Sequence, residues 1–341
     1  MLLREMKKFR FCLVFIAVLL AAVSLAQVSP GWHDPSTHRA QIVTVADGVH
    51  LEVLDWGGEG RAVVLLAGLG FTAHVFDDFA EKLAESCHVY GITRRGYGAS
   101  SRPETGYSEE RLTEDDLAVF TALNLPAPVV MGHSVAGNEL SQLGIHHADR
   151  VSGLIYLDAL NDGSDDWSEL DTLAAKLPDA MKRRPPSSPS DLKSFRAFHD
   201  WRMKTDHIDV PEAELRLDFA ENPDGSVGDE TTPAFVPQAI MSGDHKHDYS
   251  QIRVPVVAFV GYPPIPQEQI RENHVSDPVV RETIAAVFGI TVGMIRNRIR
   301  RIESAAGGAR VVDLWGASHF VFLSNEQEVL QETREFLARL H

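Results

Sequence analysis

A serine inside a run of small residues is the first feature of this sequence that is suited to chemistry. Ser134 follows an apolar, β-branched run at 128–131 and precedes a segment at 138–146 that is compatible with a helix. The run 132–137 has a small–x–Ser–x–small–small pattern, which lets a strand and a helix approach closely around a sharp turn. At such a turn the Val135 amide lies at a helix N-terminus and faces the same space as the hydroxyl. The pattern therefore predicts a nucleophile with half of an oxyanion hole.

A nucleophilic serine also needs a general base and an orienting acid. An apolar stretch at 309–315 predicts a last buried strand, and the loop after it contains His319. The order of Ser134 before His319 matches that of the α/β-hydrolases. Over roughly residues 40–341 the chain resembles that superfamily, although Ala136 stands where the G-x-S-x-G pattern has its second glycine.

Two other segments resemble the same superfamily. Residues 62–71 resemble the strand and oxyanion loop, with Ala67 in place of the usual histidine. The resemblance implies that the Leu69 amide completes the oxyanion hole with Val135, with the Gly70 amide as the neighbouring candidate. It also implies that Gly68, Gly70 and His133 lie next to the substrate.

Residues 93–100 resemble the Arg-Gly-x-Gly-x-Ser turn that precedes the nucleophile turn. We interpret this turn as structural, with Arg95 and Ser100 forming hydrogen bonds within the loop.

The acid has three candidates. Many members of the superfamily place it after the strand that we predict at 254–260, but the first carboxylate there is Glu268. The preceding strand, at 152–158, ends on Asp158, which is an alternative position for the acid in the superfamily. We therefore expect Asp158 to orient His319, with Glu268 as the second candidate and Asp162 as the third. An ordinary strand-end aspartate is the other interpretation of Asp158.

The resemblance implies an α/β-hydrolase fold, with a mostly parallel eight-stranded sheet flanked by helices and a helical cap. Helical and strand periodicities alternate along the chain, as this architecture requires. We expect one domain at 27–341 with a cap inserted at 159–252. The predicted strands lie at 41–45, 50–56, 63–67, 88–93, 129–132, 153–158, 254–260 and 310–314.

Two segments carry side chains with more than one interpretation. Aromatic residues of the cap either line an acyl or leaving-group pocket or form the cap's own small core; they are Trp167, Phe195, Phe198, Trp201 and Phe219.

Residues 279–303 predict one or two helices that end in a basic run, which we interpret as a solvated helix face. The run contains Arg296, Arg298, Arg300 and Arg301.

The first 26 residues have the pattern of a cleavable signal peptide. A basic stretch precedes an apolar core at 11–23, and small residues at Ser24 and Ala26 suit cleavage after Ala26. The apolar core is shorter than the roughly 20 residues of a membrane span, so we expect a secreted or periplasmic protein without stable membrane insertion. Cleavage leaves Cys87 as the single cysteine, which excludes an internal disulfide in the mature monomer.

The formal net charge of −16, without a basic stripe, argues against nucleic acid as a partner.

The sequence Asp244-His245-Lys246-His247-Asp248 has metal-ligand chemistry, but we interpret it as an exposed loop. We therefore expect no metal and no cofactor.

These observations predict a serine hydrolase that cleaves a carboxylic ester or a related acyl bond of a small molecule, with Ser134, His319 and Asp158 as the catalytic residues. One alternative is a non-catalytic binding protein on the same fold. The other is an NADP-dependent oxidoreductase, in which Gly68-x-Gly70-x-x-Ala73 binds the dinucleotide and Arg94 holds its 2′-phosphate.

Overall fold

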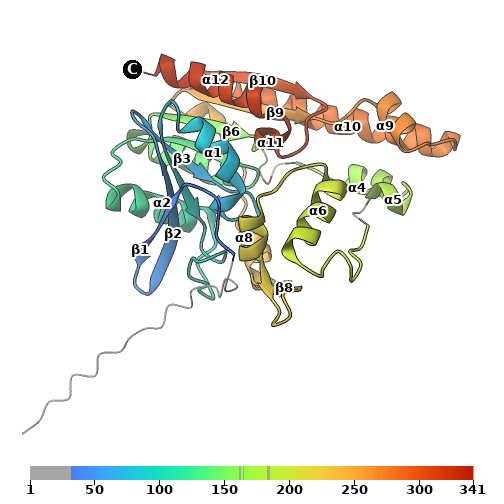
Figure 1. Ribbon diagram of the computed structural model, residues 1–341. Helices are drawn as coiled ribbons and strands as arrows, with labels where there is room; N and C mark the ends of the chain where they lie inside the picture. The colour runs from blue at the N-terminus through green and yellow to red at the C-terminus, as the bar shows by residue number, and fades with distance from the viewer. Residues whose placement is uncertain (1–31, 161–162, 164, 183–184, 341) are drawn as a thin grey trace, which may run out of the picture.

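A mostly parallel eight-stranded sheet lies at the centre of the computed structural model, which describes residues 32–340 except 161–162, 164 and 183–184. The predicted signal segment therefore lies outside the described residues. The strand order is β1-β2-β4-β3-β5-β6-β9-β10 (Figure 1). The strands are β1 (Arg39–Ala46), β2 (Val49–Gly57), β3 (Ala62–Leu66), β4 (His88–Thr93), β5 (Val129–His133), β6 (Gly153–Leu157), β9 (Val256–Tyr262) and β10 (Ala309–Trp315).

The predicted antiparallel opening is confirmed, because β1 pairs antiparallel with β2 and β2 pairs antiparallel with β4. The turn between β1 and β2 contains Gly48 with φ of 66°, a conformation that glycine adopts without steric cost. From β4 to β10 every pairing is parallel, so the carboxyl ends of these strands share one edge of the sheet. Ligands of open α/β sheets bind at this edge.

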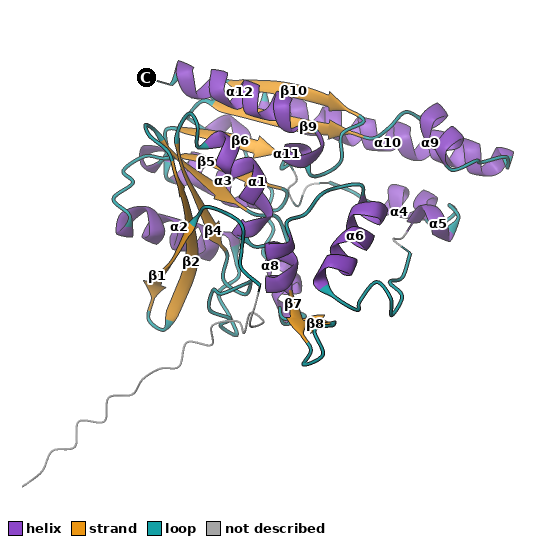
Figure 2. Cartoon of the chain, in the orientation of Figure 1, coloured by secondary structure: helices purple, strands orange, loops and turns teal. Residues whose placement is uncertain are grey.

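Helices cover both faces of the sheet and enclose two apolar cores (Figure 2). On one face pack α2 (Glu109–Ala122), α3 (Ala136–His146) and α10 (Pro278–Ile302). On the other face pack α1 (Asp77–Leu83), α11 (Val321–Ser324) and α12 (Glu326–Arg339). Burial on both sides explains why β3, β5 and β6 are continuous apolar runs rather than alternating ones.

A second group of elements lies between β6 and β9, where the cap was predicted (yellow-green to yellow in Figure 1). Phe195 and Phe198 are buried in an apolar core that belongs to this group, and Trp201 and Phe219 pack against it. Trp167 is exposed. The elements are α4 (Ser168–Ala174), α5 (Asp179–Lys182), α6 (Phe195–Asp206), α7 (Glu212–Asp218), β7 (Phe219–Glu221), β8 (Val227–Glu230) and α8 (Phe235–Ser242).

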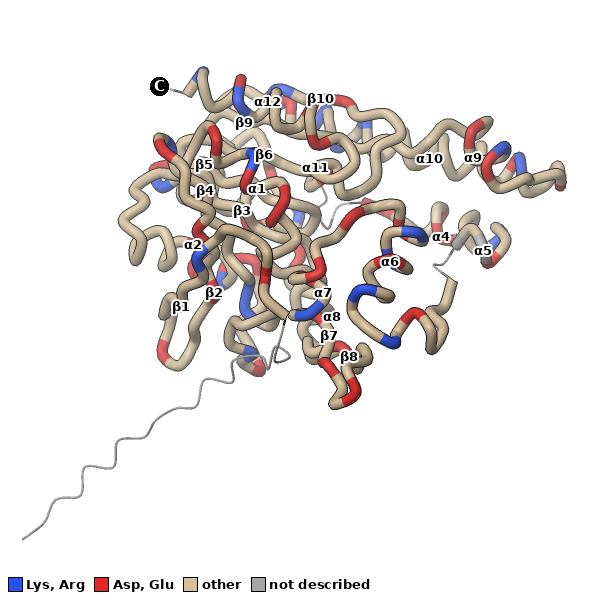
Figure 3. The backbone as a smooth tube through the Cα atoms, viewed as in Figure 1, with Lys and Arg blue, Asp and Glu red and all other residues tan. Residues whose placement is uncertain are grey.

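The helix α10 corrects one expectation. Its arginines do not all form a solvated face, because Arg298 is half-buried, donates to Asp165 at 2.7 Å and lies over the Trp167 ring. The middle turns of α10 carry no charge, as Figure 3 shows. By length and composition alone, α10 is long and apolar enough to cross a membrane. An 18-residue stretch of it has a mean hydropathy of 1.5, and 22% of that stretch is buried inside the protein.

Close backbone approach requires the small residues around Ser134. A Cβ at Gly137 would lie 1.8 Å from the carbonyl oxygen of Ala159, and one at Gly132 would lie 3.0 Å from the Cβ of Ala136. The predicted reason for these glycines is therefore confirmed.

We predict that Gly137→Ala lowers the free energy of unfolding by more than about 2 kcal/mol, because neither the backbone of α3 nor that at Ala159 can move away from the added methyl group. Gly289→Ala is the matched control. A Cβ there meets nothing within 4 Å on α10, so it should stabilise the protein by about 0.5–1 kcal/mol through helix propensity. Urea unfolding curves of both variants provide the measurement, and wild-type stability of Gly137→Ala would contradict the close approach.

Candidate active site

Ser134 occupies the turn between β5 and α3 in a strained conformation. Its φ is 55°, which a non-glycine residue adopts only at a steric cost. The turn is held from outside, because the Ser134 amide donates to the carbonyl of Leu157 at 3.2 Å. This is the geometry of a nucleophile at a strand-to-helix turn.

His319 and Asp158 form one hydrogen-bonded chain with Ser134. The Oγ of Ser134 lies 2.8 Å from Nε2 of His319, and Nδ1 of His319 lies 2.6 Å from Oδ2 of Asp158. The carboxylate accepts the Nδ1 proton, which leaves Nε2 to accept the proton of the serine hydroxyl. The three residues come from the ends of β5, β6 and β10, so the shared edge of the sheet brings them together.

Asp158 is held in place by the neighbouring strand. Its amide donates to the carbonyl of Phe259 at 2.8 Å, and its Oδ1 accepts from the Gly261 amide at 3.1 Å. Its second oxygen is then directed at His319. Of the other candidate acids, Glu268 lies on α9 (Pro266–Glu272) and Asp162 lies outside the described residues.

His133 lies below the site rather than facing a substrate. The residue is 1% exposed, and its Nε2 donates to the carbonyl of His319 at 3.0 Å. Burial, and to a lesser degree the nearby His319, lower the pKa of His133 to about 3, so the ring stays neutral. The expected contact between His133 and substrate is therefore replaced by a positioning role for the His319 loop.

The predicted oxyanion residues lie on two segments beside Ser134. Gly68 is required by packing, since a Cβ there would lie 2.7 Å from Nδ1 of His133. Leu69 and Val135 pack against one apolar cluster, and Gly70 is exposed with φ of 82°. Within the described part of the chain, neither the Leu69 nor the Val135 amide donates to another protein group. Both are thus available to an oxyanion.

The site is open to solvent, with one hollow at the oxyanion loop and another at His319. The His319 side chain is 46% exposed. One hollow of about 210 Å³ extends from the oxyanion loop to the cap, and the other, of about 370 Å³, contains His319 and Asp158. The first is lined by Gly70, Phe71, Tyr97, Arg202, Asp218 and Phe219, among others. The second includes Trp167, Met294 and Arg298.

A buried contact joins the cap to the oxyanion loop, and sequence patterns did not reveal it. The carboxylate of Glu214 accepts from the Thr72 amide at 2.8 Å and from the Thr72 hydroxyl at 2.5 Å. Burial raises the pKa of Glu214 to about 7, against the opposing effect of the Thr72 hydrogen bonds. Burial and the charge of Glu214 raise the pKa of Asp218 as well. The two residues therefore form an acid pair, with Asp218 lining the hollow between the oxyanion loop and the cap.

Two other predicted features have different roles in the structure. The guanidinium of Arg94 is buried and paired with Glu139 at 2.6 Å, so it is not available to a 2′-phosphate. In the segment 244–248, His245 is exposed but His247 is buried, and both imidazoles lie against Glu109. The expectation of an exposed loop was therefore wrong for His247.

A family model described as the alpha/beta hydrolase family matches residues 63–332. The chain belongs to this family. Over 112 residues it is 37% identical to a putative carbamate hydrolase of Caulobacter segnis, a match that covers 32% of this chain and 42% of that protein. Over 102 residues it is 33% identical to a non-heme chloroperoxidase of Streptomyces lividans, covering 29% and 37% of the two chains. These matches span less than half of either relative.

Solved structures confirm the fold over most of the chain. The crystal structure of E-2-(acetamidomethylene)succinate hydrolase has a TM-score of 0.64 and 16% identity, covering 88% of this chain and 99% of that one. The enol-lactonase from Burkholderia xenovorans has a TM-score of 0.54 and 18% identity, covering 88% and 100%. Both structures share the fold of this chain.

We predict that Glu214→Gln changes the pH dependence of stability. A carboxyl whose pKa is raised from 4.5 to about 7 on folding stabilises the protein fully below pH 4.5, and this contribution is lost as the pH rises through 7. Wild type should therefore lose stability relative to Glu214→Gln between pH 5 and pH 8, as measured by urea unfolding. Glu59→Gln, at an exposed position, should change the free energy of unfolding little at both pH 5 and pH 8. A constant difference between wild type and Glu214→Gln would contradict the raised pKa.

Proposed function

We propose that this α/β-hydrolase transfers an acyl group to water through a covalent intermediate on Ser134. His319 takes the hydroxyl proton as Oγ attacks the acyl carbon, and then returns it to the leaving group. Asp158 holds the imidazole and stabilises its protonated form. The amides of Leu69 and Val135 donate to the oxyanion. The observation that carries the proposal is the hydrogen-bonded chain from Ser134 through His319 to Asp158.

A carboxylic ester is the bond that we propose for cleavage, because its leaving group depends less on protonation by the general acid than the leaving group of an amide does. The names of the relatives point to other substrates, among them a carbamate, N-formylmaleamate and an epoxide. A serine at the turn disfavours the epoxide and dehalogenase reactions, which need a carboxylate to form an alkyl ester. The remaining bonds share attack at an acyl carbon, so an amide or a lactone is the alternative within the same mechanism.

The dimensions of the two hollows favour a small substrate. The smaller one, of about 210 Å³, is below the usual range of sites for drug-sized ligands. Its lining combines Phe71 and Phe219 with Arg202 and Asp218, which suits a short group with a polar end. We propose that it holds one side of the ester and that the hollow beside His319 holds the other.

A fluorophosphonate probe tests the activated serine. We expect one label per chain at Ser134, located by mass spectrometry, because phosphonylation needs the same base and oxyanion donors as acylation. Ser134→Ala and His319→Ala should abolish labelling. Asp158→Asn should slow it by a factor of about 10³ or more, whereas Glu268→Gln should leave it unchanged.

Circular dichroism of each variant provides the control for folding. A folded wild-type protein that takes no label would contradict the proposal and would favour the non-catalytic binding protein. Slowing by Glu268→Gln rather than Asp158→Asn would reassign the acid.

A further inference from the structure

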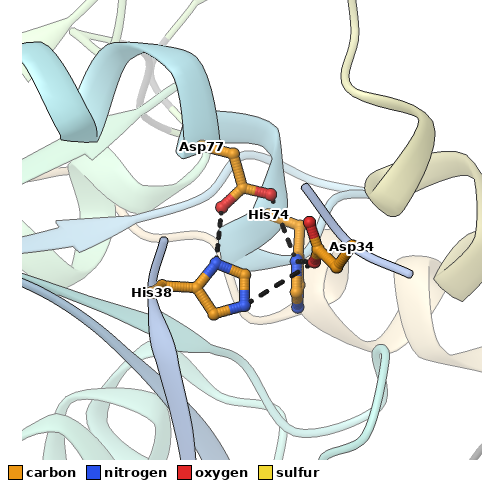
Figure 4. A group of neighbouring side chains, drawn as sticks. All are labelled: Asp34, His38, His74 and Asp77. Atoms are coloured by element: carbon orange, nitrogen blue, oxygen red, sulfur yellow. Dashed lines mark hydrogen bonds and ion pairs between the residues drawn. The ribbon is translucent and has the colours of Figure 1, made fainter. Parts of the chain in front are cut away.

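Two histidines and two aspartates converge outside the active site. Asp34 and His38 lie on the N-terminal arm that leads into β1, whereas His74 lies in η1 (Ala73–Phe76) and Asp77 begins α1. Figure 4 shows the four side chains directed toward a common centre. One nitrogen or oxygen atom from each lies within 4.8 Å of those of the others.

We propose that these four residues bind one divalent metal ion of the zinc class, which fastens the N-terminal arm to the segment behind the oxyanion loop. Nδ1 of His74 lies 3.4 Å from Oδ2 of Asp34 and 3.3 Å from Oδ2 of Asp77, and Nε2 of His38 lies 3.7 Å from the same oxygen of Asp34. Ligand atoms about 2.1 Å from a tetrahedral zinc ion are about 3.4 Å apart. All three distances exceed those of good charged hydrogen bonds. On the outer side of the group, Nδ1 of His38 lies 3.0 Å from Oδ1 of Asp77 (Figure 4).

The atoms that face away from the centre have partners of their own. On the arm, Oδ1 of Asp34 accepts from the Ser36 amide at 2.9 Å, and Nδ1 of His38 lies 2.8 Å from the Ser36 hydroxyl. Oδ1 of Asp77 accepts from Nε1 of Trp56 at 3.2 Å. Such outer partners fix the orientation of metal ligands.

His74 has the same arrangement. Its Nε2 lies 3.7 Å from Oε1 of Glu52, so Nδ1 faces the centre, and the Thr93 hydroxyl donates to the other oxygen of Glu52 at 2.8 Å. A carboxylate behind a histidine is a common outer partner in zinc sites. All four candidate ligands are therefore held with one atom directed at the centre.

Charge and burial also favour a cation. The side chains of His38, His74 and Asp77 are each at most 7% exposed, and Asp34 is 25% exposed. Buried carboxylates need a compensating positive charge. Burial lowers the pKa of His74, but Asp34, Asp77 and Glu52 outweigh that effect and raise it well above its usual value, so the same pocket that attracts a metal ion also attracts a proton.

The ligand types select the metal. Two imidazoles and two carboxylates suit zinc and other first-row transition ions, whereas calcium and magnesium prefer sites made of oxygen. A path for the ion exists, because a hollow of about 360 Å³ between the arm and the cap is lined by Asp34 and Asp77.

The location gives the ion a structural role. Thr72 accepts from the His74 amide at 3.2 Å and contacts Glu214 of the cap. The site therefore stabilises the segment that joins the oxyanion loop to α1.

The test is zinc binding by the full protein after removal of metals with a chelator. We expect one equivalent of Zn²⁺ by calorimetry, a rise in melting temperature with Zn²⁺, and a tetrahedral visible spectrum with Co²⁺. His38→Asn and Asp34→Asn should each weaken zinc binding by about 100-fold or more and remove the cobalt spectrum.

Two matched variants separate this site from other histidines. His33→Asn changes an exposed histidine of the same arm, and His245→Asn removes the histidine of the group with Glu109 and Glu110. Both should bind zinc as the wild type does. Absence of stoichiometric zinc from a folded wild type, or affinity unchanged by His38→Asn and Asp34→Asn, would overturn the proposal and leave a proton-linked ion-pair network.

Discussion

The approach of α3 to the end of β6 is the constraint on which the active site depends. Gly137 leaves room for the Ala159 carbonyl, which follows Asp158 directly, so the turn that carries Ser134 and the strand end that carries the acid are fixed against each other. The His319 imidazole then contacts both Ser134 and Asp158. The buried His133 holds the loop of His319 in place through its hydrogen bond to the His319 carbonyl. The positive φ of Ser134 is tolerated because packing on both sides determines the backbone there.

The sheet and the Ser–His–Asp arrangement were predictable because both follow from local patterns. Buried parallel strands are continuous apolar runs, and every predicted strand overlaps an observed one. Asp158 could be expected because it ends such a run, which is an alternative position for the acid in the superfamily that the sequence resembles. Glu268 was the second candidate because it is the first carboxylate after the strand predicted at 254–260. In the structure it lies on α9.

Other contacts were not predictable because they join residues that no local pattern links. Glu214 of α7 accepts hydrogen bonds from Thr72, and Arg298 of α10 donates to Asp165. The four residues of the proposed metal site come from an arm and a helical turn whose meeting depends on tertiary packing. The resemblance implied that His133 lies next to the substrate, but the alternation of side chains along β5 directs it into the core.

Capture of the acyl intermediate tests the central claim most directly. The protein is mixed with an activated short-chain ester, quenched in acid within milliseconds, and digested for mass spectrometry. The account predicts one acyl group on the peptide that contains Ser134, formed in a burst and lost at the rate of turnover. Hydrolysis without a covalent intermediate, or an acyl group on another residue, would contradict it.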